Sequence, residues 1–307
     1  MQNNQLRRAL SVFLVGGLLL APSMLFTGCI GGDGDGGSSL SRMFSEDGVQ
    51  GLQKKQAALA PYIEATNSFN GKLVTFDYAI SPTLADLRSG TPMVSCMLPG
   101  YGVLKENLEK ARADKATSGV YSDIDEAADA TLAILKDLVP VAEKLDNYYS
   151  SKGYLADNYA QGTELAQQFL PLHDQFTEAY KKMDAIVSAH NKEVHRAQFE
   201  ELKKAGKENA ATFSELNIKL RELADALEDS NFDTQAVETQ IKDITAMSEK
   251  LNGSEVNRYK SDINRYIGAV RTFLANRTND KYNDMVEEYN DLIDTANRID
   301  PEALDKK

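Results

Sequence analysis

The sequence predicts an all-α fold, an elongated bundle of long antiparallel helices without a disulfide. Apolar residues recur at three- and four-residue spacing from about residue 47 onward, which is the spacing of amphipathic helices. No alternating apolar and polar run is long enough to predict a strand. The chain has only two cysteines, Cys29 and Cys96, and if Cys29 carries lipid, Cys96 has no partner within the chain.

The first 28 residues precede this bundle and have the composition of a secretion signal. Arg7 and Arg8 form a short positive region, and the stretch from Ala9 to Ala21 is almost wholly apolar. That stretch has the length of a signal-peptide core and is short for a membrane-spanning helix. We therefore predict that residues 1–28 are a signal peptide.

The segment that ends at Cys29 resembles the lipobox of bacterial lipoproteins. Thr27 and Gly28 are the small residues that processing requires, whereas Phe26 stands where leucine is usual. We predict cleavage between Gly28 and Cys29 and attachment of fatty acid, such as palmitate, to Cys29. The alternative is an uncleaved N-terminal anchor with an incidental cysteine.

Residues 29–46 are predicted to be a lipidated flexible tether, because they are rich in Gly, Ser and Asp. Ile30 is not Asp, so the common inner-membrane retention signal at this position is absent. We expect a lipid-anchored protein of the cell envelope, on the outer membrane if the cell is Gram-negative. The acidic Gly/Asp run would equally suit export to the cell surface.

The charge balance limits how this chain meets its partners. Removing residues 1–28 takes away two arginines and no acid, so the net charge goes from −12 to −14. Such a surface repels nucleic acid and anionic headgroups. We therefore expect no nucleic-acid partner and attachment to the membrane through lipid.

The helices of the predicted domain, residues 47–307, follow from the apolar spacing and from breaker residues. The expected helices are 47 to about 87, kinked or broken at Pro61 and Pro82, then 103–113, 122–152, 157–204, 208–229, 234–251, 255–276 and 280–299. Ser122 and Asp125 form a variant of the capping box, and Ser254 is expected to cap the helix after it. Pro171 is expected to bend its helix. One bundle and two sub-bundles divided near Gly206 both fit this pattern.

Cys96 lies in an apolar stretch, and no histidine follows closely enough to activate it. We interpret it as a buried small hydrophobic residue and not as a reactive thiol.

His190 and Glu193 are three residues apart and share a helix face, as Glu and His do in metal-binding bundles. One such pair does not make a metal site, which needs three or four converging ligands. We therefore predict no metal. The simpler interpretation is a histidine at the edge of the core with a solvated Glu beside it.

A ladder of Tyr and Asn residues recurs every seven residues near the C-terminus. Its members are Tyr282, Asn283, Tyr289, Asn290 and Asn297. Tyrosines of this kind bury the ring and keep the hydroxyl wet, while Asn bridges to backbone. The functional alternative is a polar and aromatic groove for a peptide, a glycan or another small ligand.

No motif for a familiar kind of catalysis is present. The sequence has no Gly-x-Ser-x-Gly, no phosphate-cradling glycine loop and no dinucleotide fingerprint. Acidic residues are so abundant that pairs occur by chance, and nothing distinguishes one pair. We expect no enzyme and no cofactor.

An early segment carries Tyr62, Ile63 and Asn67, and the C-terminal segment carries the Tyr/Asn ladder. Together with the lipobox, these segments resemble the YiiG-type bacterial lipoproteins, which share a helical domain of unknown function. The resemblance spans about residues 50–300 and implies a helical domain in an envelope lipoprotein. It implies no activity, because that family has none assigned.

The function that these features predict is a non-catalytic, lipid-anchored interaction or scaffold module that contacts another envelope protein. Long helices expose large lateral surfaces that suit such contacts. The alternative is an envelope binding protein that holds a small ligand or metal inside the bundle, near His190, Glu193 and the Tyr/Asn ladder.

Overall fold

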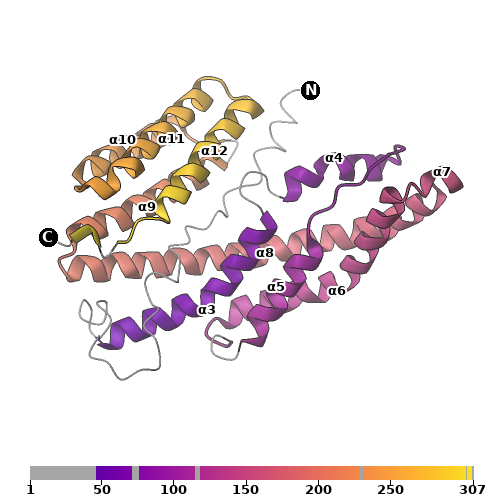
Figure 1. Cartoon of the computed structure of the whole chain (residues 1–307), viewed down its shortest axis with the longest axis horizontal. Coiled ribbons are helices and arrows are strands. Elements are labelled where there is room, and N and C mark those ends of the chain that lie inside the picture. The colour runs from indigo at the N-terminus through magenta and orange to yellow at the C-terminus, as the bar shows by residue number, and fades with distance from the viewer. Residues whose placement is uncertain (1–45, 71–75, 115–117, 229–230, 302, 306–307) are drawn as a thin grey trace. The chain divides into compact units, whose positions relative to one another are not determined.

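Figure 1 shows the computed structural model of the chain, which describes residues 46–70, 76–114, 118–228, 231–301 and 303–305. Within these ranges the fold is all-α and has no strand, which confirms the predicted fold class. The predicted signal peptide, its cleavage site at Gly28 and Cys29, and nearly all of the tether lie outside the described residues.

Ten α-helices and two short 3-10 helices make up most of the described residues. They are α3 (Glu46–Asn70), α4 (Phe76–Ser89), α5 (Tyr101–Ala113), α6 (Ser122–Ser150), α7 (Tyr154–Asp157), α8 (Ala160–Lys204), α9 (Glu208–Glu228), α10 (Thr234–Lys250), η1 (Ser254–Val256), α11 (Asn257–Ala275), α12 (Asn279–Ala296) and η2 (Ala303–Asp305). Most of the predicted boundaries fall within a few residues of these bounds.

The proline positions behave differently from the expectation of breaks. Pro61 lies inside α3 and Pro82 lies inside α4, so neither residue ends its helix. A proline in a helix removes one backbone hydrogen bond, and tertiary packing of the neighbouring side chains offsets that loss. Next to Pro61, the side chains of Leu59 and Tyr62 are buried.

Both predicted serine caps are wrong. The N-cap of α6 is Tyr121, which makes no side-chain cap bond, and Asp125 is engaged in contacts outside its own helix. Ser254 lies in η1, so the α-helix that follows begins later, with Val256 as its N-cap and no side-chain cap bond. Ser254 therefore belongs to a single turn of 3-10 helix that precedes α11, the helix that it was expected to cap.

The described residues belong to two compact units, each of which has its own core. Of the described residues, those in 58–189 form the α4–α7 unit, and those in 46–57 and 190–305 form the α9–α12 unit. The division falls inside α3 and inside α8, whereas Gly206, with φ of +68°, follows the end of α8. Glycine adopts this left-handed conformation without a steric penalty, which explains the sharp end of α8.

Aromatic rings from α3, α5 and α8 fill the centre of the α4–α7 unit. The ring centroid of Phe69 lies 5.1 Å from that of Tyr180 and 5.6 Å from that of Phe176. The ring of Tyr101 lies 5.3 Å from that of Phe176, nearly perpendicular to it. Edge-to-face pairs of this kind add about 0.5–1.5 kcal/mol each to the gain from burial. This cluster fixes α5 and α8 against α3.

The α9–α12 unit packs the apolar faces of its helices around a second core. Figure 1 shows α9 paired with α10 and α11 paired with α12, each pair joined by a short connection. Phe213, Tyr259, Tyr266 and Phe273 are almost fully buried there. Each large apolar side chain buried in this way contributes about 1.5–3 kcal/mol.

Among the described residues, no helix combines the length and the hydropathy that crossing a membrane requires.

Candidate functional site

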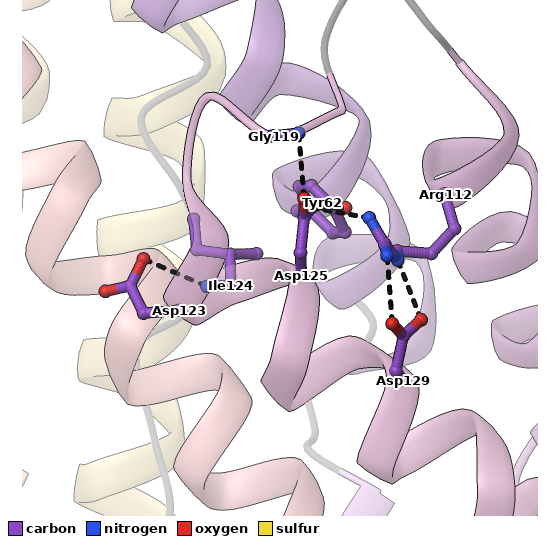
Figure 2. Close-up of polar contacts among 7 residues, drawn as sticks. All are labelled: Tyr62, Arg112, Gly119, Asp123, Ile124, Asp125 and Asp129. Atoms are coloured by element: carbon purple, nitrogen blue, oxygen red, sulfur yellow. Dashed lines mark hydrogen bonds and ion pairs between the residues drawn. The ribbon is translucent and has the colours of Figure 1, made fainter.

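A buried polar network joins three helices of the α4–α7 unit (Figure 2). Tyr62 of α3 and Asp125 of α6 are both buried, and the Tyr62 hydroxyl donates a hydrogen bond of 2.6 Å to Asp125 Oδ1. The backbone N–H of Gly119 donates to Asp125 Oδ2 at 2.8 Å. Gly119 has a φ of +80°, so a glycine at this turn avoids the strain that a side chain would bring. Asp125 therefore fixes α3 and the turn before α6 at once.

Arg112, in the last turn of α5, connects this carboxylate to a second one. Its Nη1 lies 2.8 Å from Asp125 Oδ1. Its Nε and Nη2 donate to the two carboxylate oxygens of Asp129 at 2.7 and 2.9 Å. Asp125 and Asp129 are one helical turn apart, so they present their carboxylates on the same side of α6. The guanidinium thus links α5 to α6 through two carboxylates.

The network holds Tyr62 and Arg112 in fixed protonation states. Burial first, and the hydrogen bond to Asp125 second, raise the pKa of the Tyr62 hydroxyl well above its usual range. The hydrogen bonds to Asp129 are the main cause that raises the pKa of Arg112. Tyr62 therefore stays a protonated donor, and Arg112 stays a cation. A tyrosine in this state is not a nucleophile or a base, so the arrangement suits structural linkage and not acid–base chemistry.

The sequence patterns identified only part of this network. Tyr62 was singled out through the family resemblance and Asp125 as part of a cap, but nothing linked the two residues. Arg112 and Asp129 were missed, because surface pairs of basic and acidic residues are common in a chain with 26% charged residues. One signal was available in the sequence. Asp125 and Asp129 have i, i+4 spacing, and the basic residue Arg112 lies in the last turn of the preceding helix.

A smaller polar cluster lies in the α9–α12 unit and was also missed. Asp262 of α11 is only 3% exposed, and it accepts a hydrogen bond of 2.6 Å from Thr295 Oγ1 of α12. Arg265 donates to its other oxygen at 2.7 Å. A buried carboxylate of this kind persists because each oxygen has a donor. This cluster ties α11 to α12.

The structure places His190 beside Glu193. His190 Nδ1 lies 3.5 Å from Glu193 Oε2, and the side chains are 20% and 75% exposed. The two residues share a helix face, as predicted. In the part of the chain that the structure describes, no group of three or more His, Cys, Asp and Glu side chains could hold a metal ion.

The Tyr/Asn ladder divides between the core and the surface. Tyr282 and Tyr289 are buried, and their rings lie 5.5 Å from Phe273 and 5.2 Å from Tyr266, respectively. Asn283 is exposed, whereas Asn290 and Asn297 are half-buried. The tyrosine rings thus face the core of the α9–α12 unit, which confirms the expected burial of the rings. Their hydroxyl oxygens are buried as well, so the expectation of wet hydroxyls is wrong.

Cys96 is a free and buried thiol, as its apolar surroundings predict. Burial first, and the negative charge of Asp146 second, raise the pKa of this thiol to about 12. A thiol with such a pKa is almost wholly protonated at neutral pH, so it lacks the thiolate that reacts.

These features define a class: an all-α protein of two helical units whose buried polar groups join helices. The chain belongs to the family described as "Protein of unknown function (DUF3829)", which matches residues 56–298. This match includes the four residues whose side chains join α3, α5 and α6 in Figure 2, namely Tyr62, Arg112, Asp125 and Asp129. No curated protein and no solved structure matches the chain.

Proposed function

We propose that this protein is a non-catalytic, lipid-anchored interaction or scaffold module of the cell envelope. The observation that carries the proposal is the state of the buried network in Figure 2. Tyr62 donates to Asp125, and Arg112 is occupied by Asp125 and Asp129. Polar groups that are paired with one another in this way hold helices in place. A scaffold requires a rigid helical surface of this kind.

The proposed anchor rests on the sequence around Cys29. An apolar stretch, two small residues and then a cysteine precede a Gly/Asp tether. The resemblance to YiiG-type lipoproteins supports the same assignment. The acidic net charge favours attachment through lipid, because such a chain is repelled by anionic headgroups.

The proposed anchor is tested by growing cells with labelled palmitate and comparing wild-type protein with Cys29→Ser. We expect label in the wild-type protein and none in the variant. Cys96→Ser is the matched control, because it removes the other cysteine and is expected to keep the label. Equal labelling of wild-type protein and Cys29→Ser would exclude lipid on Cys29.

The proposed interaction is tested by crosslinking in intact cells and identifying captured proteins by mass spectrometry. A scaffold is expected to capture the same envelope protein in repeated preparations and growth conditions. The protein with Cys29→Ser is the control, since a chain released from the membrane should lose that partner. Failure to capture any specific partner across conditions would count against the interaction.

One observation favours a second candidate, an envelope protein that binds a metal or small ligand. His190 and Glu193 lie 3.5 Å apart on one face of α8, as two ligands of a metal would. Elemental analysis of the purified protein separates the candidates. One zinc or iron atom per chain, lost in His190→Ala and kept in His195→Ala, would favour the second candidate over the scaffold.

A further inference from the structure

Large apolar side chains are exposed in one unit. Among the described residues these are Val94, Met97, Val103 and Leu155, with exposed fractions of 72%, 69%, 56% and 76%. All belong to the α4–α7 unit. Single exposed apolar residues are ordinary, but a group held rigidly in two neighbouring segments indicates a contact surface.

Val94 and Met97 protrude from the connection between α4 and α5. Met93 and Cys96 are buried, so this connection is attached to the interior by two side chains, while Val94 and Met97 are exposed to solvent. The N–H of Thr91 also donates to the carbonyl of Asp86 at 3.0 Å. The connection is therefore pinned at several points, and it presents two apolar side chains outward.

Charge is absent from this segment. Between Arg88 and Lys105 the sequence has no charged residue, although 26% of the chain is Asp, Glu, Lys or Arg. A surface without charges can enter an apolar environment without desolvating a carboxylate or an ammonium group.

Leu155 is held in solvent by a strained connector between α6 and α8. Lys152, Asn158 and Tyr159 have φ values of 58°, 49° and 68°, the left-handed region that side chains other than glycine rarely adopt. Strain of this kind persists only where surrounding contacts impose it. The connector therefore keeps Leu155 in place at a cost in backbone energy.

The contacts that impose this strain involve Tyr148. Its ring packs so closely on Gly153 and Gly162 that a Cβ added at either glycine would lie within 2.7 Å of the ring. Its hydroxyl donates to Asp157 Oδ1 at 2.7 Å. The connector is fixed from both sides, which makes the position of Leu155 rigid.

The two segments meet at the same end of the unit. Cys96 of the first segment lies close enough to Asp146, near the end of α6, for the charge of that carboxylate to raise the pKa of the thiol. The ring of Tyr149 lies 6.1 Å from that of Tyr154, which directly precedes Leu155. Val94, Met97 and Leu155 are here called the apolar tip.

We infer that the apolar tip rests on the uncharged acyl region of a lipid bilayer when the chain is tethered to it. The tip is too small for a stable dimer, because three such side chains bury roughly 400 Å² where an interface needs about 800 Å² from each partner. A weak contact suffices for a chain that is already tethered, because the tether supplies a high effective concentration. The inference rests on the proposed anchor at Cys29.

The test uses the lipidated full-length chain in phosphatidylcholine vesicles that contain a nitroxide-labelled lipid. A fluorophore is attached through Met97→Cys in one variant and through Leu155→Cys in another. Cys96 does not compete for the label, because it is buried and protonated. Glu126→Cys is the matched control, exposed near the start of α6 and about 35 Å along that helix from its last residue.

We expect quenching at positions 97 and 155 to exceed that at position 126 by about threefold or more, since an interfacial side chain enters the bilayer by roughly 5–10 Å. If the chain floats with the vesicles but quenching is equal at the three positions, the bilayer contact of the apolar tip is overturned and the proposed anchor is not. A chain that does not float overturns the anchor and the tip together. A dimer in solution that Leu155→Ser dissociates would assign the tip to a second copy and overturn the inference.

Discussion

Tyr62 and Asp125 are 63 residues apart in the sequence, and a hydrogen bond of 2.6 Å joins their side chains inside the α4–α7 unit. This bond connects the first described helix to the start of α6. Tyr62 is 3% exposed and Asp125 is 9% exposed, so the bond lies largely away from solvent. The bond is therefore the point at which the stability of the unit can be tested most simply.

Removing the Tyr62 hydroxyl should destabilise the protein measurably. Tyr62→Phe keeps the ring but removes the shorter of two contacts to Asp125 Oδ1, so that Arg112 Nη1 alone remains beside this oxygen. Loss of a hydrogen bond to a charged group costs about 1.5–3 kcal/mol. Urea unfolding followed by circular dichroism measures this loss. A double-mutant cycle with Asp125→Asn is the control, and strictly additive effects of the two changes would show that the residues do not interact.

The two aspartates that share Arg112 should contribute unequally. Asp125 is buried and holds three groups, so Asp125→Ala should cost about 3 kcal/mol or more. Asp129 has a side chain that is 57% exposed, so Asp129→Ala should cost less than about 1 kcal/mol. The urea midpoints of unfolding of the two variants test this prediction. Equal losses of stability in both variants would contradict the assignment of Asp125 as the centre of the network.

Cys96 should be nearly inert in the folded protein. With a pKa of about 12, its thiolate fraction at pH 8 is roughly 1,000-fold or more below that of an ordinary cysteine. Alkylation of Cys29→Ser, whose only thiol is Cys96, measures this at pH 8. The rate should rise to that of a free cysteine in denaturant, whereas rapid alkylation of the folded chain would show that the thiol is accessible.

Asp305 should stabilise the start of α9 from the far end of the chain. Its carboxylate oxygens accept the backbone N–H groups of Asn209 and Ala210, both at 3.0 Å. Asp305→Ala should therefore cost about 1 kcal/mol, the usual effect of losing an N-cap. Asp305→Asn keeps one acceptor oxygen and replaces the other with an NH2 donor, so it should lose one of the two bonds. Unchanged stability of Asp305→Ala would contradict the cap.

Helix positions were predictable because they depend on local spacing. The apolar period and breakers such as Gly206 located most of the helices to within a few residues. Of the kink or break expected at Pro61 and Pro82, the break does not occur, because a proline costs one hydrogen bond that packing of distant elements can offset. Predictions from residue spacing along the sequence do not include the packing of distant elements.

The polar network was only partly predictable because it depends on tertiary contacts. Asp125 has the spacing of a capping residue, but its carboxylate instead accepts from Tyr62 and Gly119. A sequence pattern can indicate that a carboxylate lies near the start of a helix, but it does not identify the hydrogen-bond donor that the carboxylate accepts from. By contrast, the burial of Cys96 followed from its apolar neighbours, and the burial of the Tyr289 ring followed from the seven-residue spacing of Tyr282 and Tyr289.

The anchor on Cys29 is the central claim about where this protein acts, and the intact mass of the protein purified from membranes tests it most directly. We predict a chain that begins at Cys29 and carries the additional mass of fatty acyl groups. A chain that still begins at Met1, or one that begins at Cys29 without added mass, would contradict the lipid anchor.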